Sequence, residues 1–267
     1  MMKRILFIGD VFGKPGRACV KEILPDLKKE HAPDIVIANG ENIAAGMGIN
    51  EKKYLELLEA GIDAVTLGNH SWHNKEFLKE IEHCARIIRP GNYPPGTPGA
   101  EKLVIKGVGI INLLGRVFMK EADCPFRTAD RLISEIKKET KIVVADFHAE
   151  ATSEKYAMGW YLDGRASAVI GTHTHVQTAD ERILPRGTAY LTDAGMVGAY
   201  NSVIGVEITP IVEKFLTLIP RRFEPAKTGP WVFNAVMITV DENTGKASEI
   251  KRIFRVVEET SQESERT

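Results

Sequence analysis

The sequence of 267 residues predicts an α/β fold, for three reasons. Over the first two-thirds, short β-branched runs alternate with longer helical patterns, as in βαβ units around a parallel sheet. Several of these runs are continuously apolar, as expected of strands that are buried on both faces. After about residue 185, strand-like segments follow one another without convincing helices, which favours a second, mostly antiparallel sheet.

The expected elements of the first two-thirds follow in a regular order. Strands are expected at Lys3–Gly9, Asp34–Asn39, Asp63–Leu67, Arg86–Arg89, Lys141–Phe147 and Ala168–Gly171. Helices are expected at Pro15–Glu30, Glu51–Ala60, Asn74–His83, Ala129–Glu139 and Ser153–Leu162. A proline near the start of the first helix is typical of a helix N-terminus. Gly107 separates Glu101–Lys106 from Val108–Leu113, which indicates a hairpin.

The last third is expected to consist mainly of strands. They are placed at Thr188–Thr192, Pro210–Ile219, Val232–Val240 and Ala247–Arg255. The length of the chain suits one large α/β domain or two small ones. We expect a single domain over residues 1–257, followed by a polar, frayed tail at 258–267.

Composition narrows the possible partners and the compartment. A formal net charge of −1 gives no general attraction to nucleic acid or to an anionic membrane. No apolar stretch is long enough to span a bilayer. Three widely spaced cysteines, without a Cys-x-x-Cys pair, argue against a disulfide scaffold and a thiolate zinc site. Reduced thiols in a cytoplasmic protein are therefore expected.

Five apolar runs end in side chains that can bind metal. The carboxyl end of a buried strand holds such side chains rigidly beside a crevice that is open to solvent. The side chains concerned are Asp10, Glu41 with Asn42, Asn69 with His70, His148, and His173 with His175.

Together these residues suit a dinuclear metal centre. Such a centre needs a bridging carboxylate, several further ligands and room for water between two ions about 3.5–4 Å apart. On an extended segment, the i, i+2 spacing of His173 and His175 directs both imidazoles to one face, one for each metal. Histidine and carboxylate ligands suit iron, manganese or zinc better than calcium or magnesium.

The order of these motifs resembles that of the calcineurin-like metallophosphoesterase superfamily. The motifs are Gly9-Asp10, Asn39-Gly40-Glu41-Asn42, Gly68-Asn69-His70, His148, and Gly171-Thr172-His173-Thr174-His175. The Asn-Gly-Glu-Asn motif and the opening Gly-Asp-Val-x-Gly are closer to the YmdB-like branch of that superfamily. The resemblance runs from Ile5 to beyond Asn201, and it implies a four-layer α/β/β/α sandwich of two mixed sheets.

The resemblance also implies a role for each site residue. Glu41 would bridge two metals. Asp10, Asn42 and His175 would complete one metal site, and Asn69, His148 and His173 would complete the other. His70 would donate a proton to the leaving oxygen or stabilise the phosphoryl oxygens.

Three departures from the usual superfamily motifs affect this interpretation. Phe12 stands where the first motif usually has histidine, so Asn42 is the expected substitute ligand. Glu41 replaces the usual bridging aspartate and is one methylene longer. Ser71 replaces the acidic residue that usually follows Gly-Asn-His, so the group that orients His70 is not identified, although His73 lies nearby in sequence.

The implied function is metal-dependent hydrolysis of small phosphodiesters by a metal-activated hydroxide, with 2′,3′-cyclic nucleotides as the favoured substrate. The expected cofactors are two divalent or trivalent ions, iron and/or manganese, with zinc as an alternative. Two alternatives stay open: an RNA-associated regulatory or binding protein with slow turnover, and a protein phosphatase. The expected partner is a small phosphodiester substrate, with RNA as an alternative, and no membrane association is expected. We also expect a homo-oligomer of unspecified size.

Overall fold

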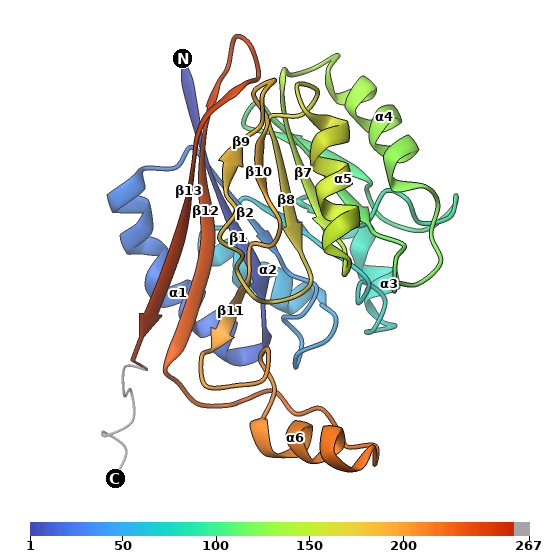
Figure 1. Ribbon diagram of the computed structural model, residues 1–267, viewed down its shortest axis with the longest axis vertical. Helices are drawn as coiled ribbons and strands as arrows, with labels where there is room; N and C mark the ends of the chain where they lie inside the picture. The colour runs from blue at the N-terminus through green and yellow to red at the C-terminus, as the bar shows by residue number, and fades with distance from the viewer. Residues whose placement is uncertain (259–267) are drawn as a thin grey trace.

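Two β-sheets packed face to face form the centre of the computed structural model, which describes residues 1–258 (Figure 1). The first sheet has seven strands in the order β13-β12-β11-β1-β2-β3-β4. Their bounds are β1 (Met2–Val11), β2 (Ile35–Asn39), β3 (Ala64–Thr66), β4 (Ile87–Ile88), β11 (Met196–Ala199), β12 (Trp231–Asp241) and β13 (Ala247–Val257).

The second sheet has six strands in the order β5-β6-β7-β8-β10-β9. Their bounds are β5 (Lys102–Ile105), β6 (Val108–Leu114), β7 (Ile142–His148), β8 (Ala168–Thr172), β9 (Arg182–Ile183) and β10 (Ala189–Leu191). The strands β6, β7, β8 and β10 are parallel, and β5 and β9 pair antiparallel at the two edges. The second sheet is therefore mixed, as is the first, in which β12 pairs antiparallel with β1.

Helices cover the outer faces of both sheets. The helices are α1 (Gly13–His31), α2 (Glu51–Glu59), α3 (Phe77–Glu80), α4 (Pro125–Ile136), α5 (Thr152–Leu162) and α6 (Ile208–Thr217), with a short 3-10 helix at Ile81–His83. Figure 1 shows α4 and α5 against the second sheet and α1 on the opposite side of the molecule. Helix α6 projects away from the sheets (Figure 1).

Within residues 1–258, three large apolar cores hold the layers together. Strand β1 alternates, so that Ile5 and Phe7 enter the core between the sheets, whereas Leu6 and Ile8 enter the core beneath α1 and α2. A third core lies between the second sheet and the helices α4 and α5. Three cores separate four layers, which confirms the expected α/β/β/α sandwich of two mixed sheets.

Three details of the sequence-based expectation were wrong. The segment expected as a strand at Pro210–Ile219 is helical as far as Thr217, because its apolar residues recur at helical spacing and Pro210 lies in the first turn, where proline is tolerated. The helix expected over Asn74–His83 is reduced to α3 and the 3-10 turn. The late strands do not form a separate antiparallel sheet, since β12 and β13 extend the first sheet and β10 joins the second.

The frayed tail expected at 258–267 lies outside the described residues, apart from Glu258. Within residues 1–258, no helix combines the length and the apolar character needed to cross a bilayer.

Candidate metal centre

All seven expected metal ligands meet where strands of both sheets end. Asp10 lies near the end of β1, and Glu41 and Asn42 follow β2. Asn69 follows β3 in the same sheet. From the second sheet, His148 is the last residue of β7, and His173 and His175 follow β8. The carboxyl ends of parallel strands thus supply every side chain of the site.

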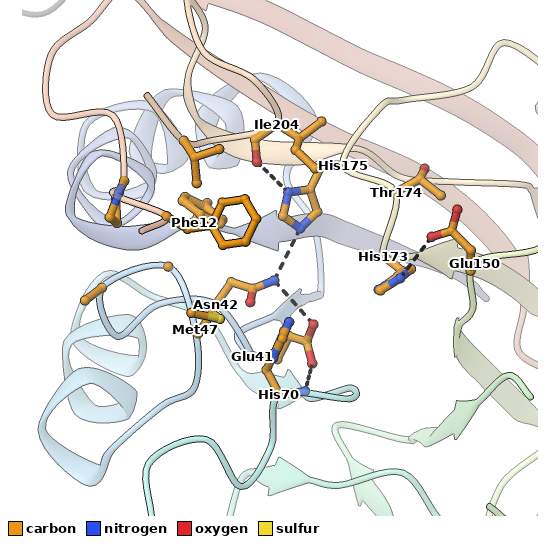
Figure 2. Close-up of a pocket in the computed structure, with 15 residues that line it drawn as sticks. Phe12, Glu41, Asn42, Met47, His70, Glu150, His173, Thr174, His175 and Ile204 are labelled. Atoms are coloured by element: carbon orange, nitrogen blue, oxygen red, sulfur yellow. Dashed lines mark hydrogen bonds and ion pairs between the residues drawn. The ribbon is translucent and has the colours of Figure 1, made fainter. Parts of the chain in front are cut away.

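The first group of these side chains surrounds the amide nitrogen of Asn42. This Nδ2 atom lies 3.3 Å from Glu41 Oε1 and 3.3 Å from His175 Nε2 (Figure 2). It also lies 3.4 Å from Asp10 Oδ1. A weakly positive amide thus lies among three atoms that could all bind one cation. For Asn42 itself to be an oxygen ligand, its amide must make a half-turn that exchanges Oδ1 and Nδ2.

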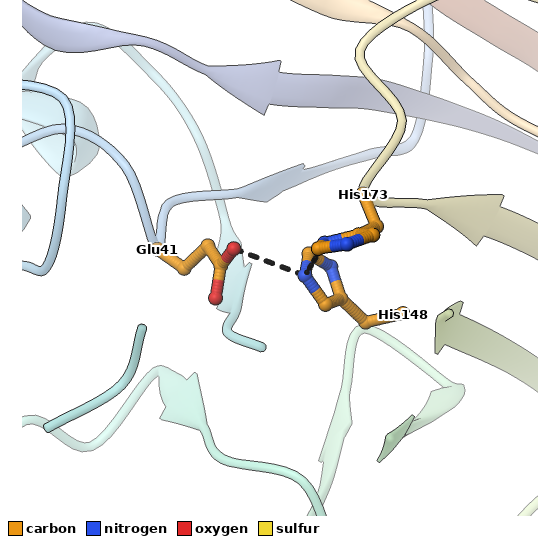
Figure 3. A group of neighbouring side chains, drawn as sticks. All are labelled: Glu41, His148 and His173. Atoms are coloured by element: carbon orange, nitrogen blue, oxygen red, sulfur yellow. Dashed lines mark hydrogen bonds and ion pairs between the residues drawn. The ribbon is translucent and has the colours of Figure 1, made fainter. Parts of the chain in front are cut away.

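The second group surrounds the imidazole of His148. Its Nε2 atom lies 3.0 Å from Glu41 Oε1, 2.8 Å from Asn69 Oδ1 and 3.0 Å from His173 Nδ1. One atom of each of Glu41, His148 and His173 lies within 4.8 Å of the others (Figure 3). The same oxygen of Glu41, Oε1, belongs to both groups.

Each of the three histidines has its other ring nitrogen engaged. Thr172 Oγ1 lies 2.9 Å from His148 Nδ1, and the carboxylate of Glu150 lies 3.1 Å from His173 Nε2. The Nδ1 atom of His175 lies 2.9 Å from the carbonyl oxygen of Ile204. If these nitrogens carry the ring protons, the lone pairs of His148 Nε2, His173 Nδ1 and His175 Nε2 face the centre. This is the usual arrangement of metal-binding histidines.

Electrostatics in the protein without metal agree with a site built for cations. Burial alone would raise the pKa of Glu41, but the adjacent His148 outweighs burial and brings that pKa to about 2. Burial opposes protonation of His148, yet Glu41 raises its pKa to about 9. Burial, reinforced by the charge of His148, lowers the pKa of His173 to about 3. A proton on His148 therefore stabilises the buried Glu41 carboxylate without metal, and a cation bound at Nε2 would displace that proton.

His70 lies at the edge of the centre and touches the shared carboxylate through its backbone. Its backbone nitrogen donates to Glu41 Oε2 over 2.7 Å. Its ring Nδ1 lies 3.4 Å from His73 Nδ1, and the two rings pack edge to face. Burial lowers the pKa of His70. Ser71 donates to the carbonyl of Gly68 instead, and His73 is the side chain in contact with the His70 ring.

Close backbone packing explains why glycines precede the ligands. A Cβ atom on Gly68 would lie about 2.4–2.5 Å from atoms of Glu41 and His148. A Cβ atom on Gly171 would lie 1.8 Å from the carbonyl oxygen of Thr192. Such distances are far below van der Waals contact. A side chain at Gly68 would displace Glu41 and His148, and one at Gly171 would displace the backbone at Thr192.

An apolar pocket opens directly onto the centre. It has a volume of about 400 Å³, and Glu41, Asn42, His70, His173 and His175 line it (Figure 2). Apolar side chains form most of the wall: Phe12, Met47, Ile204, Val206, Phe223 and Pro225. Phe12, which replaces the usual histidine, packs edge to face on His175 with ring centroids 5.5 Å apart. No lysine or arginine within residues 1–258 lines this pocket.

A buried ion pair, which the sequence analysis missed, supports the His-Thr-His turn. Lys155 Nζ donates to Asp193 Oδ2 over 2.6 Å, and both side chains are fully buried. Asp193 Oδ2 also accepts from the backbone nitrogen of Thr174 over 3.0 Å. His173 and His175, on either side of Thr174, have positive φ angles of 109° and 66°. Asp193 directly follows an apolar strand and Thr192, a position that resembles those of the expected ligands.

The chain is similar to known proteins over nearly its whole length. A family model described as YmdB-like protein matches residues 6–253. The 2′,3′-cyclic-nucleotide 2′-phosphodiesterase of Bacillus subtilis (strain 168) is 52% identical over 255 residues, which cover 94% of this chain and 96% of the relative.

Two solved structures share the fold over nearly the whole chain. A protein from Thermus thermophilus is 45% identical, with a TM-score of 0.87 over 95% of this chain and 99% of the other. A structure described as a novel phosphatase from Mycoplasma pneumoniae is 36% identical, with a TM-score of 0.91 over 97% and 95%.

Proposed function

The chain belongs to the YmdB-like protein family, and from that membership we propose that it opens 2′,3′-cyclic nucleotides with the help of two metal ions. It is a phosphoesterase, in keeping with relatives named as phosphodiesterase and phosphatase. The name of the Bacillus subtilis relative specifies a 2′-phosphodiesterase. The bond broken in our proposal is therefore the one between phosphorus and the ribose O2′, which leaves a 3′-phosphate.

One observation carries the proposal: Glu41 Oε1 is common to two groups of metal-binding atoms. We assign Glu41 as the bridge. Asp10, Asn42 and His175 would hold one ion, and Asn69, His148 and His173 would hold the other. Mixed nitrogen and oxygen donors favour iron and manganese, with zinc as the alternative.

The side chains around the ions would complete the chemistry. Bound metal ions lower the pKa of water and neutralise charge on the phosphoryl oxygens. His70, half-buried at the pocket edge, would protonate the leaving O2′. His73, 3.4 Å from the His70 ring, would keep that ring oriented.

The pocket supports a small substrate over the alternatives. A volume of about 400 Å³ suits one nucleotide, and aromatic and aliphatic walls suit a nucleobase. Binding of long RNA depends on lysine and arginine contacts to phosphates, and the pocket lining within the described residues supplies none. No specific observation on the described residues favours RNA binding or protein dephosphorylation.

We also propose a cytoplasmic location, one domain over residues 1–257, and self-association. The three free cysteines are compatible with a reducing compartment. The late strand β12 pairs with β1, and β13 pairs with β12, so both ends of the described chain belong to one sheet, which supports one domain. On and after α6, Phe215, Leu216 and Leu218 are 74–85% exposed, which is unusual for a monomer surface. Light scattering coupled to size-exclusion chromatography tests self-association.

The proposed function is tested by metal analysis combined with a substrate screen. Purified protein would be loaded with Mn²⁺ or Fe²⁺ and offered 2′,3′-cyclic nucleotides, 3′,5′-cyclic nucleotides, a phosphomonoester, a phosphopeptide and a short RNA. We expect two metals per chain and turnover of the 2′,3′-cyclic nucleotides to 3′-monophosphates. Salt-sensitive RNA cleavage without cyclic-nucleotide turnover would favour the RNA alternative, and selective phosphopeptide hydrolysis would favour a protein phosphatase.

A further inference from the structure

A buried carboxylate outside the expected ligand set lies directly beneath the metal centre. Asp146, on β7, is fully buried and precedes His148 by two residues, so both side chains lie on the same face of the strand. A buried carboxylate is costly unless donors satisfy it. The partners of Asp146 come from both sheets, which distinguishes it from a residue that merely stabilises its own strand.

One oxygen of Asp146 acts on His148. Thr172 Oγ1 donates to Asp146 Oδ1 over 2.6 Å. A threonine hydroxyl has only one hydrogen, so its 2.9 Å contact with His148 Nδ1 uses an oxygen lone pair. Nδ1 must therefore carry a proton, so Nε2 is the nitrogen that can bind a cation once its own proton is lost.

The other oxygen of Asp146 acts on Glu41. Asp146 Oδ2 accepts from Asn39 Nδ2 over 3.1 Å and also from the hydroxyl of Thr66. The backbone nitrogen of Glu41 in turn donates a hydrogen bond to Oδ1 of the same Asn39 side chain over 3.1 Å. Asn39 and Thr66 end two strands of the first sheet, so a single carboxylate links both sheets beneath the centre.

We infer that Asp146 is the positioning residue of the metal centre: it fixes the tautomer of His148 through Thr172 and the place of Glu41 through Asn39. This inference rests on the proposed function, since it concerns a centre that binds metal. Partners of this kind orient metal ligands, and their loss usually lowers metal affinity by about 10–100-fold.

The test compares three variants with a matched control. Thr172→Val removes the hydroxyl but keeps the shape, Thr172→Ser keeps the hydroxyl, and Asp146→Asn removes the charge. Thr188→Val is the control, because Thr188 is equally buried and donates to the carbonyl of Ala166 over 2.6 Å in a different set of contacts. Zn²⁺ affinity is measured by competition with a chromophoric chelator. Nitrogen-15 NMR of the zinc-loaded protein reports which nitrogen of His148 carries the proton.

We expect Thr172→Val and Asp146→Asn to lower Zn²⁺ affinity by about 10–100-fold and to weaken or abolish the slowly exchanging Nδ1–H signal of His148. Thr172→Ser should restore both properties, and Thr188→Val should change neither. Should Asp146→Asn fail to fold, the threonine pair alone decides the matter.

Two results would overturn the inference, and they are distinguishable. Normal Zn²⁺ affinity and an unchanged Nδ1–H signal in Thr172→Val would overturn the positioning role alone. Failure of the unaltered protein to bind Zn²⁺, Mn²⁺ or Fe²⁺ would overturn the proposed function and the positioning role together.

Discussion

Replacing Lys155 by methionine should destabilise the protein and loosen the turn that carries two histidines. The Lys155 ammonium is fully buried and lies 2.6 Å from Asp193 Oδ2. Its loss leaves a buried carboxylate without its partner, which typically costs about 3–5 kcal/mol. For a chain of this size, about 2–4 °C per kcal/mol gives a fall in Tm of roughly 6–20 °C.

Urea denaturation and calorimetry of the metal-free protein would measure this effect. Lys29→Met is the matched control, because Lys29 forms an exposed pair with Asp26 and should matter by less than about 1 kcal/mol. The double variant Lys155→Met with Asp193→Asn should recover part of the loss, since no unpaired charge remains. A Lys155→Met protein as stable as Lys29→Met would refute the reasoning.

Four further predictions concern the site itself. Glu41→Gln should bind clearly fewer than two metals per chain and lose activity; two metals by mass spectrometry in this variant would exclude the bridge. His70→Ala should keep both metals but lower kcat by about 10²–10⁴-fold, the usual effect of losing an acid–base group, and metal loss would instead make His70 a ligand. Phe223→Ala should raise KM for cyclic nucleotides severalfold with little change in kcat, whereas Phe215→Ala, outside the pocket, should leave KM unchanged. Equal effects of the two variants on KM would show that the nucleobase does not bind against Phe223. The pKa of His148 near 9 lies above its ordinary 6.5, so its protonation stabilises the metal-free fold fully below pH 6.5, and this contribution is lost as the pH rises through 9. Metal binding at pH 7.5 should therefore release about one proton from His148, measurable by calorimetry in buffers of different ionisation enthalpy; no proton release would contradict this.

The residues at strand ends were predictable because two local signals coincide there. A β-branched run predicts a buried strand, and the polar residue that follows must lie at the rim of the sheet. Asp10 and His148 both fit this pattern. The structure brings them together with the other expected residues, although their assignment as ligands remains a prediction.

Other features depend on contacts between distant segments. Asp146 and Asp193 act by holding other groups, and only the packed sheets show which groups those are. The placement of β12 beside β1 is likewise a long-range pairing that no local pattern specifies. The β-branched and aromatic composition of helix α6 favours a strand, whereas the spacing of its apolar residues is that of a helix.

The donor atoms of the centre are divided between the sheets by element. The expected oxygen donors belong to the first sheet, on Asp10, Glu41, Asn42 and Asn69. The expected nitrogen donors belong to the second sheet, on His148 at the end of β7 and on His173 and His175 after β8. During synthesis the oxygen donors emerge first, as a set that discriminates poorly among divalent ions. We expect tight and selective metal capture only after β8 has joined β7 and the two sheets have closed on each other. Metal loading would then be a late event of folding, and it would mark the chains whose two sheets have packed correctly.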